Sequence, residues 1–253
     1  MDRKFLILIV ITVGLAACRS HYGVTAIERS RIVVDRRYDA RPDAKAVAFL
    51  QPYTQKVDSL TGQKVGHSAK YMTVRRPESE LSNLLADIMV WAGKFYQETP
   101  DIGVYNMGGI RADLPEGEVT YGDVLDIAPF ENKIAFVTLS GDEVLELFSN
   151  HASTRGEGVS HGVELVITKG GELVSAKLNG SPINPQRDYR IATIDYLLEG
   201  NDKMTAFQKS RNINSPTEER NDTRYIIMDY FREKEKQGGI VDACIEGRVV
   251  VEK

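Results

Sequence analysis

Apolar residues recur at helical spacing in several stretches of the chain. The first predicted helix begins after Asp43, which can cap it, and ends at Gly62. A second begins around Pro77 to Ser79, because the residue before a proline disfavours the helical conformation, and continues to about Gln97. The apolar stripe of the first helix predicts a packing role, and its members are Val47, Phe49, Leu50, Tyr53, Val57 and Leu60.

Two capping-box patterns and one glycine pair predict the remaining helices. Thr120 with Asp123, and Ser140 with Glu143, each place a hydroxyl three residues before a carboxylate at a helix start. A last helix is expected from about Thr223 to Lys236, closed by Gly238 and Gly239.

Short apolar or alternating runs predict strands between these helices. Ile134 to Leu139 is apolar enough to be buried on both faces, and Asn179-Gly180 is a strong turn signal. The polar stretch from Gln208 to Asn221 is expected to be a mobile loop. The other expected strands are a possible edge strand from Val24 to Val34, Ile102 to Tyr105, Val163 to Thr168, Leu173 to Leu178, Arg190 to Asp195 and Arg248 to Val251. Together these elements predict an α+β fold, a single domain over 43–253 with a mixed β-sheet and flanking helices.

The N-terminus resembles a bacterial lipoprotein signal. Arg3 and Lys4 precede the apolar run Phe5 to Leu15, and small residues then lead to Cys18. We therefore expect a signal peptide over 1–17, lipidation of Cys18, a tether over 18–42, and a membrane-anchored protein of the bacterial cell envelope that faces the periplasm or the cell surface. An ordinary secretory signal with an accidental cysteine is the alternative. Cys244 is then left alone, and we expect it to be a small core residue.

The charge balance argues against one class of partner. The net charge is -4 and the pI is near 5.7, so the chain has no basic excess for binding a nucleic acid polymer. Any nucleotide bound here must be held by a few well-placed cations.

The stretch from Asn106 to Arg111 is the strongest candidate for a ligand-facing turn. Gly108 and Gly109 would allow positive φ angles and a close approach to a bound group. Arg111 supplies a planar donor fork for carboxylate or phosphate. Arg75, just before a predicted helix N-terminus, could share an anion with that helix. A plain turn and a solvated arginine remain the alternatives for the two sites.

Four spaced blocks resemble the C-terminal, substrate-recognising domain of 5'-nucleotidases and UDP-sugar hydrolases. They are Arg75-x-x-Glu78 with Ser82-Asn83-Leu84 and Asp87, Asn106 to Arg111, Pro129-Phe130-x-Asn132, and Tyr196 to Asp202. Ser82, Asn201 and Lys203 stand where the family usually has glycine, so the last loop is expected to be stiffer.

The resemblance implies a nucleotide clamp. Phe130 and Tyr196 would sandwich the base, Asp202 would accept hydrogen bonds from the ribose, and Asn106 would touch the base. Arg75 and Arg111 would hold phosphate, while Gly108 and Gly109 would line the site. Stacking a base on an aromatic ring contributes ~1–3 kcal/mol, and a carboxylate can only accept, which suits a diol. Core packing is the alternative for the two rings.

Full-length family members carry a separate metallophosphatase domain with two metal ions. The four histidines here, His21, His67, His151 and His161, do not have the spacing of a metal site, and we expect His151 and His161 to be surface or loop residues. We expect no catalytic residue, metal or cofactor in this chain, so that it is not an enzyme alone. Two functions remain: the nucleotide-recognition component of a 5'-nucleotidase-type hydrolase in extracytoplasmic nucleotide catabolism, completed by a separately encoded metallophosphatase that holds the divalent metals; or a stand-alone nucleotide- or nucleoside-binding lipoprotein.

Overall fold

The computed structural model describes residues 22–252, so the expected signal peptide and Cys18 lie outside the described residues. The chain divides between Leu50 and Gln51 into two units. The first unit, from residue 22 to the helix that begins at Ala44, contains turns and coil, and the edge strand predicted from Val24 to Val34 does not form.

Helix α2 (Ala44–Thr61) begins where the sequence predicts it. The Asp43 side chain accepts hydrogen bonds from the amides of Lys45 and Ala46, which stabilises the first turn. The structure buries no residue of α2, and Val57 and Leu60 are both about half exposed. The packing role predicted for its apolar stripe is therefore wrong for the folded chain described here.

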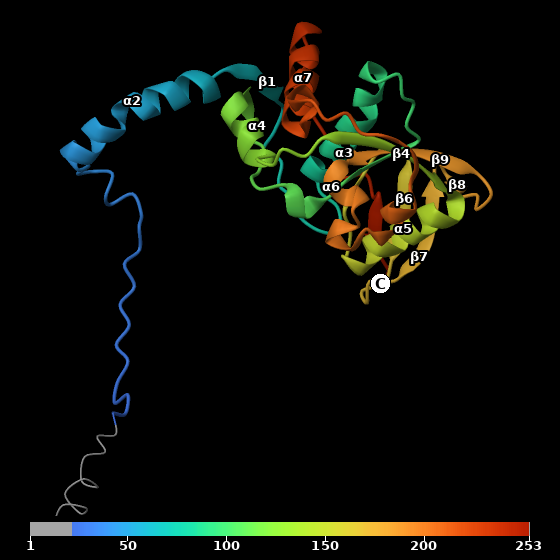
Figure 1. Ribbon diagram of the computed structural model, residues 1–253, viewed down its shortest axis with the longest axis horizontal. Helices are drawn as coiled ribbons and strands as arrows, with labels where there is room; N and C mark the ends of the chain where they lie inside the picture. Colours follow the sequence, from blue (N-terminus) through green and yellow to red (C-terminus); the bar gives the residue numbers. More distant parts are fainter. Residues whose placement is uncertain (1–21, 253) are drawn as a thin grey trace, which may run out of the picture. The chain divides into compact units, whose positions relative to one another are not determined.

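A five-stranded sheet organises the second unit, with strand order β10-β4-β9-β2-β5. Figure 1 shows its neighbouring strands β4 and β9. β2 (Ile102–Tyr105) pairs parallel with β9 (Asp188–Ile194), whereas β4 (Ile134–Ser140) pairs antiparallel with β9, with Ile134 opposite Ile194. The predicted mixed sheet is thus confirmed. All four residues of β2 are buried, so both faces of the sheet are covered at this strand.

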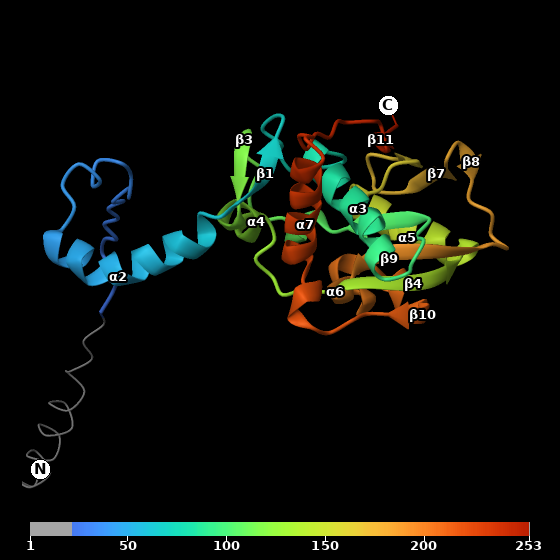
Figure 2. The ribbon, with the colours of Figure 1, turned by 90° about the horizontal axis from the view of Figure 1, so that it is seen from above.

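Helices pack on this sheet, and the cap predicted at Ser140 forms. α3 (Glu80–Ala92), capped by Ser79, packs on β2 and β5 (Gly158–Val159), while α5 (Gly141–Ser153), capped by Ser140, packs on β4. α3 and α7 (Thr223–Lys236) lie side by side (Figure 2). α3 ends earlier than predicted, and a short 3-10 turn η1 (Gly93–Phe95) follows it.

The segment predicted to be a mobile loop contains regular secondary structure. It contains β10 (Arg211–Asn214), which forms an edge of the five-stranded sheet by pairing with β4, and the 3-10 turn η5 (Glu219–Asn221). A polar strand of this kind escapes prediction because it owes its place to backbone pairing with β4 and buries none of its residues.

Two smaller sheets complete the second unit. β1 (Lys64–Ser68) pairs with β3 (Gly117–Thr120), and the second sheet has the order β11-β6-β7-β8. The remaining elements are α4 (Tyr121–Ile127), α6 (Asp195–Leu198), η2 (Met107–Gly109), η3 (Asn201–Lys203), η4 (Thr205–Lys209), β6 (Val163–Ile167), β7 (Leu173–Leu178), β8 (Ser181–Pro182) and β11 (Val249–Val251).

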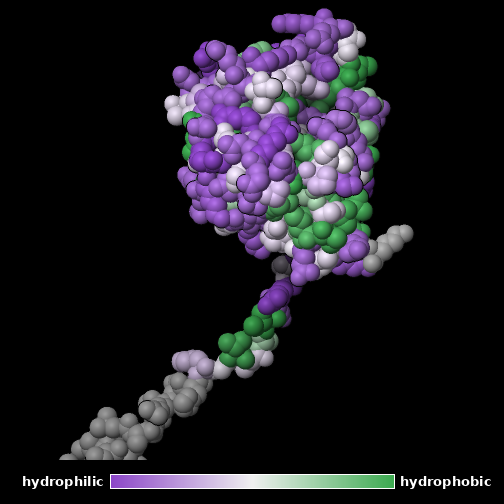
Figure 3. Space-filling view, turned by 90° about the vertical axis from the view of Figure 1, so that its right-hand side faces the viewer, coloured by the Kyte–Doolittle hydropathy of each residue, from purple (hydrophilic) through white to green (hydrophobic). Residues whose placement is uncertain are grey.

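The face of the second unit seen in Figure 3 is mainly hydrophilic, with a smaller apolar area at its lower right. Cys244 is exposed, so its prediction as a core residue is wrong. Within residues 22–252, none of the helices has both the length and the apolar character needed to cross a membrane.

Candidate functional site

Several candidate binding residues lie close together because they follow or precede strands of the five-stranded sheet at the same end of those strands. Asn106 follows the C-terminal end of β2, and Tyr196 lies in α6, which follows the C-terminal end of β9. β2 and β9 are parallel, and β4 is antiparallel to β9, so Asn132, just before β4, reaches the same end. Residues far apart in the sequence are thereby brought together.

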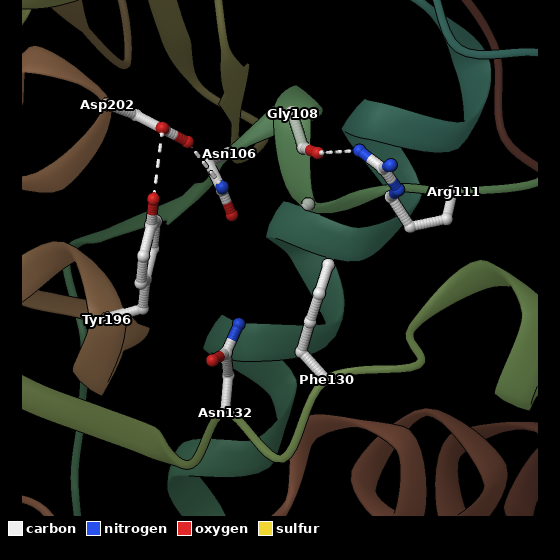
Figure 4. Close-up of a pocket in the computed structure, with 8 residues that line it drawn as sticks. Asn106, Gly108, Arg111, Phe130, Asn132, Tyr196 and Asp202 are labelled. Atoms are coloured by element: carbon white, nitrogen blue, oxygen red, sulfur yellow. Dashed lines mark hydrogen bonds between the residues drawn. The ribbon is translucent and has the colours of Figure 1, made fainter.

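A cavity of about 240 Å³ opens at this end of the strands (Figure 4). It contains seven of the eight residues predicted to bind substrate, and Arg75 is the one that it lacks. The lining residues are Asn106, Gly108, Gly109, Arg111, Phe130, Asn132, Tyr196 and Asp202.

Two aromatic rings stand on opposite sides of the cavity. Phe130 is 45% exposed and Tyr196 is 37% exposed, so neither ring belongs to the hydrophobic core. The Arg111 guanidinium lies 5.9 Å from the centre of the Phe130 ring, within the range of a cation–π contact. Burial, followed by the charge of Asp202, raises the pKa of the Tyr196 hydroxyl, which stays protonated and neutral at physiological pH.

Asp202 ties the two halves of the pocket together. The Asn106 Nδ2 atom donates a 2.6 Å hydrogen bond to one carboxylate oxygen, and the Tyr196 hydroxyl donates a 3.3 Å bond to the other. The Asn106 Oδ1 atom is buried in the cavity wall and has no hydrogen-bond partner among the described residues. A buried acceptor without a partner is costly, and a ligand donor in the cavity could satisfy it.

The glycines of the turn differ in what their small size does, and Gly109 is the one with a close contact. Neither Gly108 nor Gly109 has a positive φ angle, so the predicted conformational role is wrong. A Cβ atom at Gly109 would instead lie 2.7 Å from the Asn106 Oδ1 atom, and one at Gly108 would lie 3.4 Å from the Asp202 carboxylate. Gly109 therefore lets the Asn106 amide occupy the cavity wall.

The loop that carries Asp202 contains the predicted departures from glycine. Asp202 and Lys203 have φ angles of 51° and 66°, in the left-handed region. Such a conformation costs a residue with a Cβ atom ~1–2 kcal/mol. The loop is thus held in a geometry that its residue types do not favour, and Asn201 braces it by donating a 2.9 Å bond to the carbonyl of Tyr196.

Arg75 is exposed and does not line the cavity. Its neighbour Arg76 instead pairs with the buried carboxylate of Glu157 and donates a 2.7 Å bond from Nε to the carbonyl of Thr154. The structure therefore brings Arg111, but not Arg75, to the pocket.

Asn132 is the lining residue that was not predicted to bind substrate. Its backbone carbonyl accepts a 2.8 Å hydrogen bond from the amide of Thr223, at the start of α7. In Figure 4 its amide lies between the two rings on the floor of the site. The block Pro129-Phe130-x-Asn132 was the signal that could have identified it.

His151 is completely buried, so its prediction as a surface or loop residue is wrong. Both of its ring nitrogens lack a partner among the described residues. Within the part of the chain that the structure describes, no group of three or more His, Cys, Asp or Glu side chains is arranged to hold a metal ion.

Comparison with known proteins gives a consistent match. The sequence model of the family "5'-nucleotidase, C-terminal domain" matches residues 63–209, more than half of the chain. The trifunctional nucleotide phosphoesterase protein YfkN of Bacillus subtilis is 27% identical over 250 residues, covering 90% of this chain but 16% of that protein. The cell wall protein Lmo0130 of Listeria monocytogenes is 25% identical over 234 residues, 83% of this chain and 29% of that protein.

Solved structures agree on the fold. The 5'-nucleotidase precursor from Thermus thermophilus superposes with a TM-score of 0.72 and 26% identity, over 84% of this chain and 44% of that one. This chain thus spans less than half the length of the relatives it matches. Since the matched region contains every residue of the cavity, the chain belongs to the 5'-nucleotidase C-terminal domain family.

Proposed function

We propose that this protein binds a nucleoside or nucleotide in the cavity and serves as the substrate-recognition component of a 5'-nucleotidase-type hydrolase. The observation that carries the proposal is the pairing of Phe130 and Tyr196, two half-exposed rings on opposite sides of one cavity that also holds a carboxylate and a guanidinium. A base between two rings gains stacking energy on both faces.

The polar groups fit the rest of a nucleotide. Asp202 can accept hydrogen bonds from a ribose diol, and Asn106 offers its unfilled Oδ1 atom to a donor on the base. Among the described residues, the Arg111 side chain makes a 3.3 Å hydrogen bond to the carbonyl of Gly108, so its remaining donors are available for phosphate. Arg75, which was also predicted to hold phosphate, would need a rearrangement to reach the cavity.

The proposal includes a partner. The proteins that this chain resembles include a nucleotide phosphoesterase, and this chain spans only a part of that protein's length. We propose that a separately encoded metallophosphatase, with its own divalent metals, closes on the phosphate end of the ligand. This would place the protein in extracytoplasmic nucleotide catabolism, anchored through a lipidated Cys18, and the resemblance to a cell wall protein of Listeria supports such a location.

A stand-alone binding lipoprotein is the second candidate. It is favoured by the fact that one compact unit, 51–253, supplies all eight lining residues of the cavity. In that case binding would not depend on a partner.

Calorimetry with adenosine and AMP tests both functions. We expect wild-type protein to bind both ligands, and Arg111→Ala to weaken AMP by about tenfold while leaving adenosine within about twofold, because the guanidinium acts on phosphate charge. The preference for AMP should also lose part of its salt dependence.

A second arm addresses the partner. Affinity purification from native membranes should recover a metallophosphatase, and adding it should produce AMP hydrolysis that Phe130→Ala impairs. If no such partner is recovered although adenosine and AMP bind, the stand-alone function is the correct one. If neither ligand binds, with or without the partner, the proposed function is wrong.

A further inference from the structure

Glu157 lies beneath the ligand-facing turn without lining the cavity. Its side chain is 1% exposed, and its Oε2 atom accepts a 2.6 Å hydrogen bond from the backbone amide of Met107. Met107 is the first residue of the 3-10 turn η2, whose leading amides have no partner within the turn. Met107 is itself buried, so its amide is shielded from bulk water and relies on the carboxylate as its acceptor.

The pairing of β5 with β2 delivers Glu157 to this position. Gly158 lies opposite Tyr105, so that residue 157 lies next to the point where β2 runs into Asn106. A Cβ atom at Gly158 would come within 2.8 Å of the Ser82 carbonyl and 2.9 Å of the Tyr105 carbonyl. This close approach fixes the backbone from which the Glu157 side chain projects.

Arg76 compensates the charge of the buried carboxylate. Its Nη2 atom donates to the Glu157 Oε1 atom, and its Nε atom donates to the carbonyl of Thr154, three residues earlier in the same loop. Burial raises the pKa of Glu157, and the Arg76 charge opposes that shift. One carboxylate oxygen is thus engaged by the arginine, which leaves the other for the amide of Met107.

We propose that Glu157 is the positioning residue of the pocket: its carboxylate, held by Arg76, fixes the amide of Met107 and thereby the places of Asn106 and Gly108 in the cavity wall. The inference rests on the proposed function for its effect on binding. Its structural part, the restraint on the turn, stands on the contacts of Glu157 alone. Nothing in the four sequence blocks pointed to this residue, which lies 50 positions from the turn it restrains.

Two conservative variants of Glu157 separate its contact with the Met107 amide from its ion pair with Arg76. Glu157→Gln keeps the length of the side chain and a carbonyl oxygen for Met107, but loses the ion pair with Arg76. Glu157→Asp keeps the charge for Arg76 but withdraws the carboxylate by one methylene from Met107. If Glu157 acts by positioning the turn, Glu157→Asp should weaken adenosine binding by about tenfold and Glu157→Gln by clearly less, because a buried amide without an acceptor carries the larger penalty.

Amide hydrogen exchange on the unliganded variants supplies a readout that does not depend on binding. We expect the Met107 amide to exchange faster in Glu157→Asp than in wild type or Glu157→Gln. If wild-type protein binds no adenosine, the proposed function fails, whereas faster exchange at Met107 would still support the restraint.

Glu98 is the matched control, since its side chain is also ion-paired and largely buried. It lies near the N-terminal end of β2, whereas Glu157 contacts the turn that follows the C-terminal end. Glu98→Asp should leave both adenosine affinity and Met107 exchange as in wild type. Glu157 is not a positioning residue if Glu157→Gln binds more weakly than Glu157→Asp, if the Met107 amide keeps wild-type exchange in Glu157→Asp, or if Glu98→Asp has the same effects.

Discussion

The two ends of strand β2 differ in how completely their polar groups are satisfied. At the C-terminal end, the Asn106 Oδ1 atom is buried without a partner among the described residues, and Arg111 makes a long hydrogen bond to its own turn. At the N-terminal end, Asp101 accepts a 2.8 Å bond from the amide of Arg190 and pairs with Arg187. We call the C-terminal end of β2, with its unsatisfied polar groups, the open end. The N-terminal end, whose polar groups are paired, is the closed end.

Arg190 shows how far the closed end is satisfied. Its guanidinium donates two bonds of 2.7 and 2.6 Å to Glu98, one of 3.1 Å to Thr138 and one of 2.6 Å to the carbonyl of Asn212. The bonds from Arg190 to Glu98, together with one from Asn214, lower the pKa of the Glu98 carboxyl. Such a network has little capacity left for a ligand, so we interpret it as structural, whereas unfilled donors and acceptors around a cavity indicate a binding site.

The largest expected effect comes from breaking the closed end. Arg190→Ala leaves the Glu98 carboxylate, whose side chain is 15% exposed, without its ion-pair partner. We expect the free energy of unfolding to fall by about 3 kcal/mol, measured by urea denaturation. Adenosine affinity of the folded fraction should stay within about twofold of wild type. A large loss of affinity would show that the two ends are coupled and would break the comparison.

The open end should respond in the opposite way. Phe130→Ala and Tyr196→Ala should each weaken adenosine by ~1–3 kcal/mol, because each removes a stacking face. Since both rings are about half exposed, the free energy of unfolding should change by less than about 1 kcal/mol.

Phe95→Ala is the control for these two variants, because Phe95 is 58% exposed and packs edge-on against Trp91 rather than in the cavity. It should leave adenosine affinity unchanged. Equal losses in all three variants would mean that general destabilisation, rather than stacking, weakens binding.

His151 sharpens the comparison, since an unsatisfied polar group in the core is not a binding site. Burial, aided by the charge of Arg76, lowers the pKa of His151 from 6.5 to about 3. The unfolded chain therefore takes up a proton near pH 6.5 that the folded chain refuses until about pH 3. The stability linked to His151 is fully present above pH 6.5 and is lost as the pH falls, by up to about 1.4 kcal/mol per pH unit.

His151→Leu removes this titration. Between pH 7.5 and 5.5, wild-type protein should lose about 1.4 kcal/mol more of its unfolding free energy than the variant, as measured by urea denaturation at both values. The carboxyl groups, Glu157 included, are common to both proteins, so their contributions to the pH dependence of the unfolding free energy cancel in the difference. Parallel pH profiles would mean that the His151 ring titrates normally and is not sealed from water.

Features set by local chemistry were predictable from the sequence. The capping boxes at Thr120 and Ser140 form as expected, and the last helix has the predicted bounds of Thr223 and Lys236, because caps and helical periodicity depend on residues within a few positions. Most of the cavity was predictable for a different reason, since its residues fall within blocks that resemble a known family.

Two of the misses depend on distant neighbours. β10 forms by pairing with β4, and Glu157 finds its amide partner 50 positions away. His151 is a different miss, because it follows Phe148 by three residues and Val144 by seven on the buried face of α5, where helical spacing places it. Arg75 and Arg76 are adjacent in the sequence, and no local pattern shows which of them is drawn inward. In the folded chain it is Arg76 that points inward, because it pairs with the buried carboxylate of Glu157.

The anchoring of Asn132 by Thr223 has a consequence for the order of folding. The chain before α7 already contains all eight lining residues, but without α7 the segment before β4 lacks the hydrogen bond that holds it. If the proposed ligand binds the folded unit and not the unfolded chain, it stabilises that unit by about 2.7 kcal/mol when its concentration is a hundred times its Kd. That stabilisation would reach the segment before β4 only after α7 has packed and the hydrogen bond from Thr223 has formed.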